Sequence, residues 1–456
     1  MMPDQQSRSD RLSEFVAALV RDKGVPGVAV GILQGDEVST AGFGVTSVEN
    51  PLPVTPDTLF QIGSITKTFT ATAILRLVDQ GKLLLDAPVR KYVPEFRVAD
   101  DEASAGATLR HLLTHTGGWE GDIFEDTGLG DDALARYVPT MAGLGQIAPV
   151  GAHFSYNNSG FNLLGRIIEA VTGKSYEAAL RDLVLEPLGL QHTFIFPADV
   201  MTHRFVVGHS VGEKGAAVLR PWPIPRASWA AGGIASAVPE LLRYARFHLG
   251  DGTASDGTRL LSPESMAAMH APQVTLWGKE SWGLGWVIDD SAGVRQISHG
   301  GGTLGQVSLL ALVPERQFAL AVVTNADRGG QITHEVLRWA LKEYLGVESP
   351  EGPKPIEATR EMLIPYVGRY FRPTMDLEIG ILGGRLVAQA AEKGGFPTRN
   401  CPPPPLEPPA ALGLCEQDRL LVVDGPGKGM RIDVIRRPDG AVGWLRVGLR
   451  LVRKEG

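Results

Sequence analysis

The chain has 456 residues, of which 43% are hydrophobic and 21% charged, with a formal net charge of -7. This length can bury a large core in two or three domains, and the composition excludes disordered, collagen-like and coiled-coil proteins. Charges of both signs are spread along the chain, so no basic surface for nucleic acid is expected.

The N-terminal segment MMPDQQSRSDRLSEF is polar, and no stretch approaches the roughly 20 apolar residues that a membrane span requires. A cytoplasmic protein without a membrane span is therefore expected. Its only two cysteines, Cys401 and Cys415, flank a proline-rich stretch. We expect free thiols there, with a disulfide as the alternative.

A predicted helix and a pair of strands open the chain, and a similar set closes its first 350 residues. In chain order these elements are a helix at 8–23, strands at 27–33 and 38–45, strands at 284–289, 307–313 and 318–325, and a helix at 331–346. They predict an α/β (α+β) fold whose antiparallel sheet, flanked by helices, receives an all-helical insertion at about 60–230. A cleft between sheet and insertion would be the natural site.

The segment at 60–81, FQIGSITKTFTATAILRLVDQG, predicts a buried helix that begins after Gly63 and ends at Gly81. Ser64 lies at its start, and Lys67 follows one turn later on the same face, where its amine can reach the serine hydroxyl. Ser-x-x-Lys alone is a weak motif, since a capping serine and a solvated lysine are commoner. However, a lysine in so apolar a helix requires a role for its charge.

Two further segments downstream contain candidate site residues. In the first, HFSYNNSGFNLLGRIIEAVTG, Tyr156 and Asn158 precede an amphipathic helix, although a simple helix cap explains these residues equally well. In the second, ISHGGGTLGQVSLLALV, His299 and three glycines stand just before a predicted strand. Such glycines would let a substrate approach backbone amides closely, and a flexible hairpin is the alternative.

Several other motifs are expected to be structural. Ser210 lies in the pattern GHSVG, but no helix follows it as a nucleophile elbow requires, so a surface loop is expected. Lys174 belongs to a Gly-Lys-Ser sequence that suits a helix end better than a phosphate loop. His111 and His115 have the spacing of zinc ligands, yet no third ligand is apparent, and packing or capping roles are expected for both.

After Gly346 a polar, proline-containing linker leads to a second domain, with the boundary near residue 355. Strand-like runs separated by Gly, Pro and Asp predict a small all-β barrel or sandwich at 356–456. Residues 400–412 are proline-rich, and we interpret them as a long loop. Since the region 1–350 looks like a closed unit, a fragment ending near residue 350 is expected to keep a competent Ser64 site.

The order of the three segments resembles the active-site elements of the class C β-lactamase group, which includes family VIII carboxylesterases, D-aminopeptidases and other penicillin-binding-protein-like hydrolases. LRHLLTHTGG, AAGGIASAVPELLRYARF and SHGGGTLGQVSLLALVPE also look like that family. The resemblance covers roughly 10–345. The segment that opens with YVGRYFRP is similar, more loosely, to the lipocalin-like barrel of some members.

The resemblance implies that Ser64 is the nucleophile and that Lys67 and Tyr156 share the work of general base. A tyrosine near its reference pKa of about 10 is a poor base at neutral pH, so either an adjacent ammonium stabilises its phenolate or a neutral lysine acts directly. Asn158 would hold Lys67 or the substrate. Backbone N–H groups of Ser64 and Gly302, with Gly301 beside them, would form the oxyanion hole.

His299 stands where β-lactamases usually carry a lysine that holds the substrate's carboxylate, which favours esters, amides or D-amino-acid peptides over β-lactams. The expected protein is thus a serine hydrolase acting on a small molecule or short peptide, without cofactor or metal. A peptide-cyclising thioesterase, a true β-lactamase and a non-catalytic ligand sensor are the alternatives. Homo-oligomerisation is left open.

Overall fold

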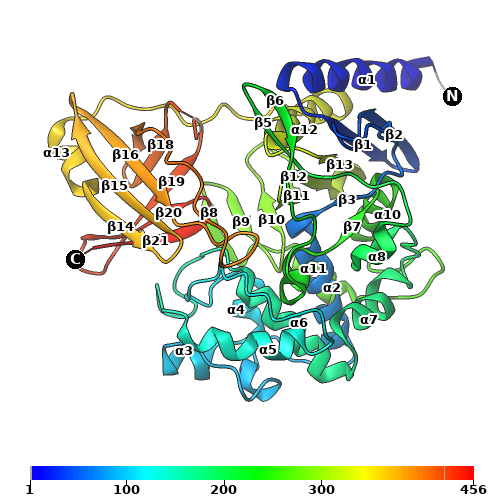
Figure 1. The fold of residues 1–456 in the computed structure, drawn as a ribbon, viewed down its shortest axis with the longest axis horizontal. Helices are drawn as coiled ribbons and strands as arrows, with labels where there is room; N and C mark the ends of the chain where they lie inside the picture. The colour runs from blue at the N-terminus through cyan, green and yellow to red at the C-terminus, as the bar shows by residue number, and fades with distance from the viewer. Residues whose placement is uncertain (1–2, 426, 456) are drawn as a thin grey trace.

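The computed structural model describes residues 3–425 and 427–455. It confirms the expected fold class: helices packed on an antiparallel sheet, followed by a closed antiparallel β-barrel. In Figure 1 the barrel lies to one side, and the helical region lies below the sheet. The two cysteines are free thiols, as expected.

The main sheet has eight strands, and strands from the beginning and the end of residues 1–350 pair with each other within it. Strand β1 pairs with β13, Val28 opposite Thr324, although almost the whole hydrolase region separates them in sequence. The spatial order is β2 (Glu37–Gly44), β1 (Gly27–Gln34), β13 (Phe318–Thr324), β12 (Gln306–Val313), β11 (Gln296–Thr303), β10 (Val287–Asp289), β9 (Glu280–Trp282) and β8 (Val274–Trp277).

The two faces of this sheet are covered by different helices because side chains alternate along each strand. On β1, Val28, Val30 and Ile32 belong to the core under α1 (Pro3–Lys23) and α12 (Gly329–Leu345). Ala29 and Leu33 face the other core, which includes α10 (Val238–Leu249). Gly31 lies between Ala29 and Leu33 on this face of β1. A Cβ at Gly31 would lie 2.4 Å from the side chain of Val238, so α10 packs directly on the strand backbone.

The helical region fills the chain between β2 and β8. Its elements are η1 (Gly63–Ile65), α2 (Thr66–Asp79), η2 (Val89–Lys91), α3 (Asp101–Gly106), α4 (Leu109–Leu113), α5 (Ala133–Thr140), η3 (Met141–Gly143), α6 (Asn158–Thr172), α7 (Tyr176–Leu180), η4 (Arg181–Leu185), α8 (Pro197–Val200), η5 (Arg226–Ser228), α9 (Trp229–Gly232) and α11 (Pro263–Met269). Short strands β3 (Phe60–Gln61), β7 (Ala235–Ser236) and β4 (Thr193–Phe194) form a small sheet at its edge.

Helix α2 is buried on nearly all sides, as its sequence predicts. Its threonines are tolerated there because their hydroxyls bond to nearby groups. Thr68 donates to the carbonyl of Ile65 at 2.8 Å, and Thr70 donates to that of Ala230 at 2.7 Å. This central helix therefore provides a rigid support for Ser64 and Lys67.

The C-terminal barrel closes where β14 pairs with β21, Tyr370 opposite Lys454. A short helix α13 (Arg360–Leu363) and a turn η7 (Ile364–Tyr366) precede it. Its strands are β14 (Gly368–Arg372), β15 (Met375–Leu382), β16 (Arg385–Glu392), β17 (Ala410–Glu416), β18 (Arg419–Val422), β19 (Arg431–Arg436), β20 (Val442–Val447) and β21 (Arg450–Lys454). The resemblance to a lipocalin stays a prediction.

Several local expectations need correction. The glycines after His299 lie inside β11 rather than before a strand. Strands β8, β9, β14 and β17 were not expected. Ser210 lies on β5 (His209–Gly212), which pairs with β6 (Gly215–Val218), instead of in a loop. As predicted, however, no helix follows it directly.

Other expectations are confirmed. Gly173 ends α6 in the left-handed conformation with φ 69°, and Ser175 caps α7, so the Gly-Lys-Ser sequence is a helix end. His111 completes the capping box of α4 with Thr108, and His115 packs against the ring of Tyr156. Among the residues described, no helix is long and apolar enough to cross a membrane.

Candidate active site

A cleft of about 830 Å³ opens between the start of α2, strand β11 and the barrel. All but one of the predicted site residues line it: Ser64, Tyr156, Asn158, His299, Gly301 and Gly302. The exception, Lys67, is completely buried beneath the cleft floor. The structure therefore brings three segments that are far apart in sequence to one place.

The turn that carries Ser64 is held by backbone contact with β11. Gly63 has φ 51°, a left-handed conformation that favours glycine, and a Cβ there would lie 2.5 Å from the nitrogen of Gly302. At Gly301 a Cβ would lie 1.9 Å from the carbonyl oxygen of Ile62. These two glycines let β11 approach the turn that carries Ser64, and the part of Gly301 in binding a substrate stays a prediction.

Lys67 Nζ has three polar neighbours. It lies 3.0 Å from Ser64 Oγ, 2.7 Å from Asn158 Oδ1 and 2.6 Å from the carbonyl oxygen of Ala231 on α9. The last two oxygens can only accept hydrogen bonds. An ammonium has three N–H groups and can donate to all three oxygens, including Ser64 Oγ. A neutral amine has two N–H groups for Asn158 and Ala231, and its lone pair then faces the serine hydroxyl.

The surroundings of Lys67 favour the neutral amine. Burial lowers its pKa well below the usual lysine range, and the positive charge of Arg450 adds to this effect, while Asp122 opposes it. The rings of Tyr156 and Phe161, whose centres lie 4.9 Å and 5.6 Å from Nζ, also oppose it, because an aromatic face attracts an ammonium ion. Burial is thus the main influence that destabilises the ammonium form of Lys67 beside Ser64.

Tyr156 lies between the side chains of Lys67 and Arg450. Its ring centre is 4.9 Å from Lys67 Nζ and 4.7 Å from the guanidinium of Arg450. Burial raises the pKa of the phenol above its ordinary value, although Ser64 and Arg450 act in the opposite direction. Its hydroxyl is buried and forms no hydrogen bond of ordinary geometry within the described chain. The phenol is therefore neutral, and its proton is available to a substrate.

His299 is buried at the cleft wall as a neutral ring. Its Nδ1 lies 2.6 Å from the carbonyl oxygen of Gly300, which can only accept, so the proton is on Nδ1. Burial and the nearby Lys67 lower the pKa of His299 to about 3. Nε2 is buried without a partner in the described part of the chain. At neutral pH this residue offers the cleft an acceptor and no positive charge.

Four functional neighbours were missed from the sequence: Ala231, Asp122, Arg372 and Arg450. Asn158 Nδ2 donates to Asp122 Oδ1 at 2.7 Å, and Asp122 in turn binds the two arginines of the barrel. Ala231 lies in the AAGG segment, whose family likeness was a usable signal. Arg372 lies in the YVGRYFRP segment, whose looser family likeness was a weaker signal. Nothing in the sequence around Asp122 and Arg450 distinguishes them from ordinary charged surface residues.

Residues 12–342 match the family described as Beta-lactamase. The chain belongs to this family. Penicillin-binding protein 4 of Amycolatopsis lactamdurans is 37% identical over 370 residues, which cover 78% of this chain and 95% of that protein. Esterase EstB of Burkholderia gladioli is 30% identical over 333 residues, 65% of this chain and 84% of the esterase. The expected family is thereby confirmed.

Solved structures extend the likeness of this Beta-lactamase family member to the barrel. SurE with D-Leu covers 99% of this chain and 100% of its own, at 26% identity and TM-score 0.77. The octameric penicillin-binding protein homologue from Pyrococcus abyssi covers 97% and 99%, at 27% identity and TM-score 0.65. A D-stereospecific amidohydrolase from Streptomyces sp. covers 74% and 98%, at 26% identity and TM-score 0.60.

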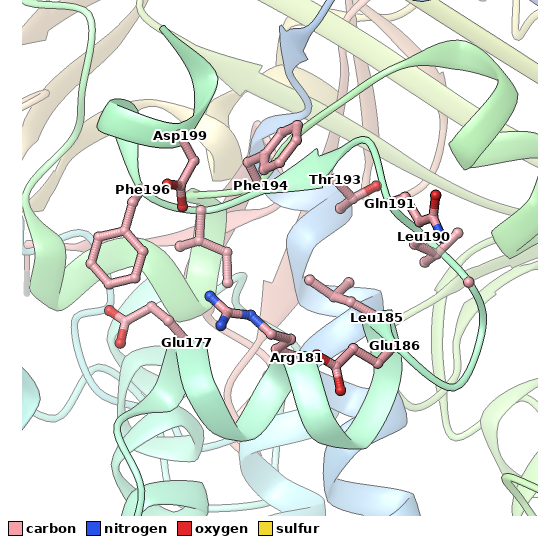
Figure 2. Close-up of a pocket in the computed structure, with 12 residues that line it drawn as sticks. Glu177, Arg181, Leu185, Glu186, Leu190, Gln191, Thr193, Phe194, Phe196 and Asp199 are labelled. Atoms are coloured by element: carbon pink, nitrogen blue, oxygen red, sulfur yellow. The ribbon is translucent and has the colours of Figure 1, made fainter. Parts of the chain in front are cut away.

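A second cavity, of about 390 Å³, lies between α7, η4 and β4. Figure 2 shows Arg181 extending into it between Glu177 and Glu186. Glu177 is bound by Arg226 at 2.9 Å. The described residues that line this cavity include no serine, lysine or histidine. Over 3–425 and 427–455, no cluster of His, Cys, Asp or Glu suits a metal ion.

Proposed function

We propose that this protein is a serine hydrolase that forms an acyl-enzyme at Ser64 on esters, amides or D-amino-acid-containing peptides. The observation that carries the proposal is the 3.0 Å approach of Lys67 Nζ to Ser64 Oγ, with the other two partners of the amine being acceptors. This arrangement supports Lys67, rather than Tyr156, as the group that removes the serine proton.

In acylation, the proton of Ser64 Oγ passes to Lys67 as Oγ bonds to the substrate's carbonyl carbon. When the tetrahedral intermediate collapses, the bond to the leaving group breaks, and the leaving oxygen or nitrogen takes the phenolic proton of Tyr156. The proton on Lys67 then restores the phenol. In deacylation, water attacks the carbonyl carbon of the ester at Ser64, and its proton passes through Lys67 and Tyr156 to Ser64 Oγ. The bond between Oγ and the acyl carbon breaks, which frees Ser64 and releases the acid.

The negative charge on the intermediate's oxygen needs donors that are already in place. The backbone N–H groups of Ser64 and Gly302 are the candidates, because Gly63 and Gly302 are in close backbone contact. A Cβ at Gly302 itself would meet nothing within 4 Å, so that side of the strand is open to a substrate.

The substrate class rests on the relatives and on His299. EstB is named an esterase, the Streptomyces protein a D-stereospecific amidohydrolase, and SurE was solved with D-Leu. A neutral His299 lacks the charge with which a lysine would hold the carboxylate of a β-lactam. Esters and D-configured amides are therefore preferred over cephalosporins. If an amine replaces water in deacylation, the same site becomes a peptide-cyclising thioesterase, which is the second candidate.

The proposal is tested by covalent labelling and a substrate panel. A fluorophosphonate should add one label, mapped by mass spectrometry to Ser64, and Ser64→Ala should abolish it. Ser210→Ala serves as the matched control and should label normally. Among p-nitrophenyl esters, D-amino-acid amides, peptide thioesters and nitrocefin, nitrocefin should not be the best substrate. A tenfold preference for it, about 1.4 kcal/mol, would overturn the specificity argument. Turnover without a label at Ser64 would overturn the mechanism.

A further inference from the structure

Two arginines of the barrel bind a carboxylate that belongs to the hydrolase region. Arg450 Nε and Nη2 donate to Asp122 at 2.8 and 3.2 Å, and Arg372 Nη1 donates to the same carboxylate at 3.2 Å. The Asp122 side chain is only 12% exposed. Burial alone would raise its pKa, but the two arginines and Asn158 hold it below the ordinary value. Asp122 is thus a carboxylate whose charge depends on the barrel.

The same carboxylate is connected to the amine of Lys67 by two hydrogen bonds through Asn158. Asn158 donates to Asp122 through Nδ2 and accepts from Lys67 through Oδ1, both at 2.7 Å. An amide that is bound at both ends cannot rotate without losing one of the bonds. The orientation that lets Asn158 accept from Lys67 is therefore fixed by Asp122, and Asp122 is fixed by the barrel.

We propose that Arg450, assisted by Arg372, is a positioning residue that prepares Lys67 for catalysis through Asp122 and Asn158, so that the barrel is an activating part of the hydrolase site. The inference rests on the function proposed above. It replaces the expectation that a fragment ending near residue 350 keeps a competent site, because such a fragment would lack both arginines.

Backbone contacts hold the segment that carries Arg450 in place. The hairpin between β20 and β21 reaches the cleft, where the carbonyl of Leu449 accepts from the N–H of Tyr156 at 2.8 Å. The N–H of Leu451 donates to Ser155 Oγ at 3.1 Å. Leu449 has φ 70°, which is unfavourable for a bulky residue and is sustained by these surrounding bonds. Strain at this position is consistent with a functional contact between barrel and site.

The charges of Arg450 and Asp122 affect the proton affinity of Lys67, which can be measured. The charged and titratable groups around Lys67 are Arg450, which disfavours its ammonium form, Asp122, which favours it, and the neutral side chains of Tyr156, His115 and His299. If Arg450 becomes neutral, the influence of Asp122 is less opposed and the ammonium form of Lys67 gains. Lys67 then accepts the Ser64 proton only at higher pH.

The experiment measures the rate of fluorophosphonate labelling against pH in the full chain. Arg450→Gln should move the acid limb of the profile upward by about one pH unit, which lowers the rate about tenfold below the limb, and should approach the wild-type rate at high pH. Adding Asp122→Asn to Arg450→Gln should move the acid limb of the profile back to lower pH. Arg450→Lys, which keeps the charge without the two-pronged bond, should leave the limb near its wild-type position with a lower plateau.

Arg399→Gln is the matched control. Arg399 also joins the barrel to the loop that carries Asp122, through Glu125 at 2.7 Å, but it is 77% exposed and does not contact the site. Its profile should coincide with that of the wild type. A pH-independent loss in Arg450→Gln, or a profile like that of Arg399→Gln, would overturn the proposal.

A second measurement does not depend on activity. In protein made with 13C-labelled lysine, the Cε resonance of Lys67, assigned by its absence in Lys67→Arg, reports the titration of the amine directly. It should titrate at higher pH in Arg450→Gln than in the wild type, and equal titration in both would refute the inference. Absence of any label on wild-type Ser64 would instead count against the proposed function, so the two failures are distinguishable.

Discussion

The two walls of the cleft are built in different ways. On one wall the nucleophile turn and β11 touch through backbone atoms, with glycines at 63 and 301 where no side chain fits. On the other wall the barrel reaches the site mainly through charged side chains, Arg372 and Arg450 on Asp122. Backbone packing fixes the positions of groups, whereas charges also change the proton affinity of their neighbours. If the proposed mechanism holds, the first wall places the oxyanion donors and the second adjusts the proton affinity of Lys67.

The largest effects are expected at the reacting groups between the two walls. Lys67→Met removes the proton acceptor for Ser64, and kcat/KM for an ester should fall by about 10³-fold or more. Ester kinetics with circular dichroism to confirm folding would test this. Folded Lys67→Met with wild-type turnover would exclude Lys67 as the base.

The backbone wall is tested by two neighbouring glycines. At Gly301 an added Cβ lies 1.9 Å from the carbonyl of Ile62, whereas at Gly300 the nearest atom, Ser308 O, is 3.7 Å away. Gly301→Ala should lower the unfolding free energy by about 1–3 kcal/mol and slow labelling of Ser64. Gly300→Ala is the control and should change neither by much. Chemical denaturation and labelling rates provide the comparison, and equal effects would contradict the packing argument.

The pH profile distinguishes Lys67 from the other titratable groups. An unshifted lysine, with a pKa of about 10.4, would make hydrolysis rise only in alkaline solution. Because the pKa of Lys67 is lowered, its amine is neutral above that lowered value, and activity should persist at neutral pH and fall as acid protonates it. His299 titrates near 3, so His299→Gln should leave the limb where it is. If the acid limb of the profile moves in His299→Gln, the limb reports the titration of His299 and not that of Lys67.

The smallest effect is expected at a contact between barrel and sheet that does not involve Asp122. Arg431 pairs with Glu280 on β9, and its side chain is 40% exposed. Exposed pairs contribute little, so Arg431→Gln should change the unfolding free energy by about 0.2–1 kcal/mol and leave the acid limb unmoved. Thermal unfolding and the pH profile measure both quantities. A limb shift equal to that of Arg450→Gln would show that net interface charge, rather than the Asp122 contact, matters.

Local patterns in the sequence were sufficient for the helix that carries Lys67 and for three strands of the main sheet. The 3.6-residue period places Ser64 and Lys67 on one helix face, and alternating apolar runs predict β1, β12 and β13, because these signals lie within a few residues of each other. Family likeness then joined Tyr156, Asn158 and His299 to them. Strand β11 escaped prediction because its glycines carry no apolar signal, and their small size serves a contact with the distant residue Ile62.

The tertiary structure alone decided how the base is tuned. Asp122 and Arg450 are more than 300 residues apart, and each looks like a surface charge until the barrel docks and removes both from water. The choice between Lys67 and Tyr156 as proton acceptor depends on burial and on charges from both domains, which no local pattern encodes. Sequence therefore determined which groups could react, while the packing of two domains decided their protonation.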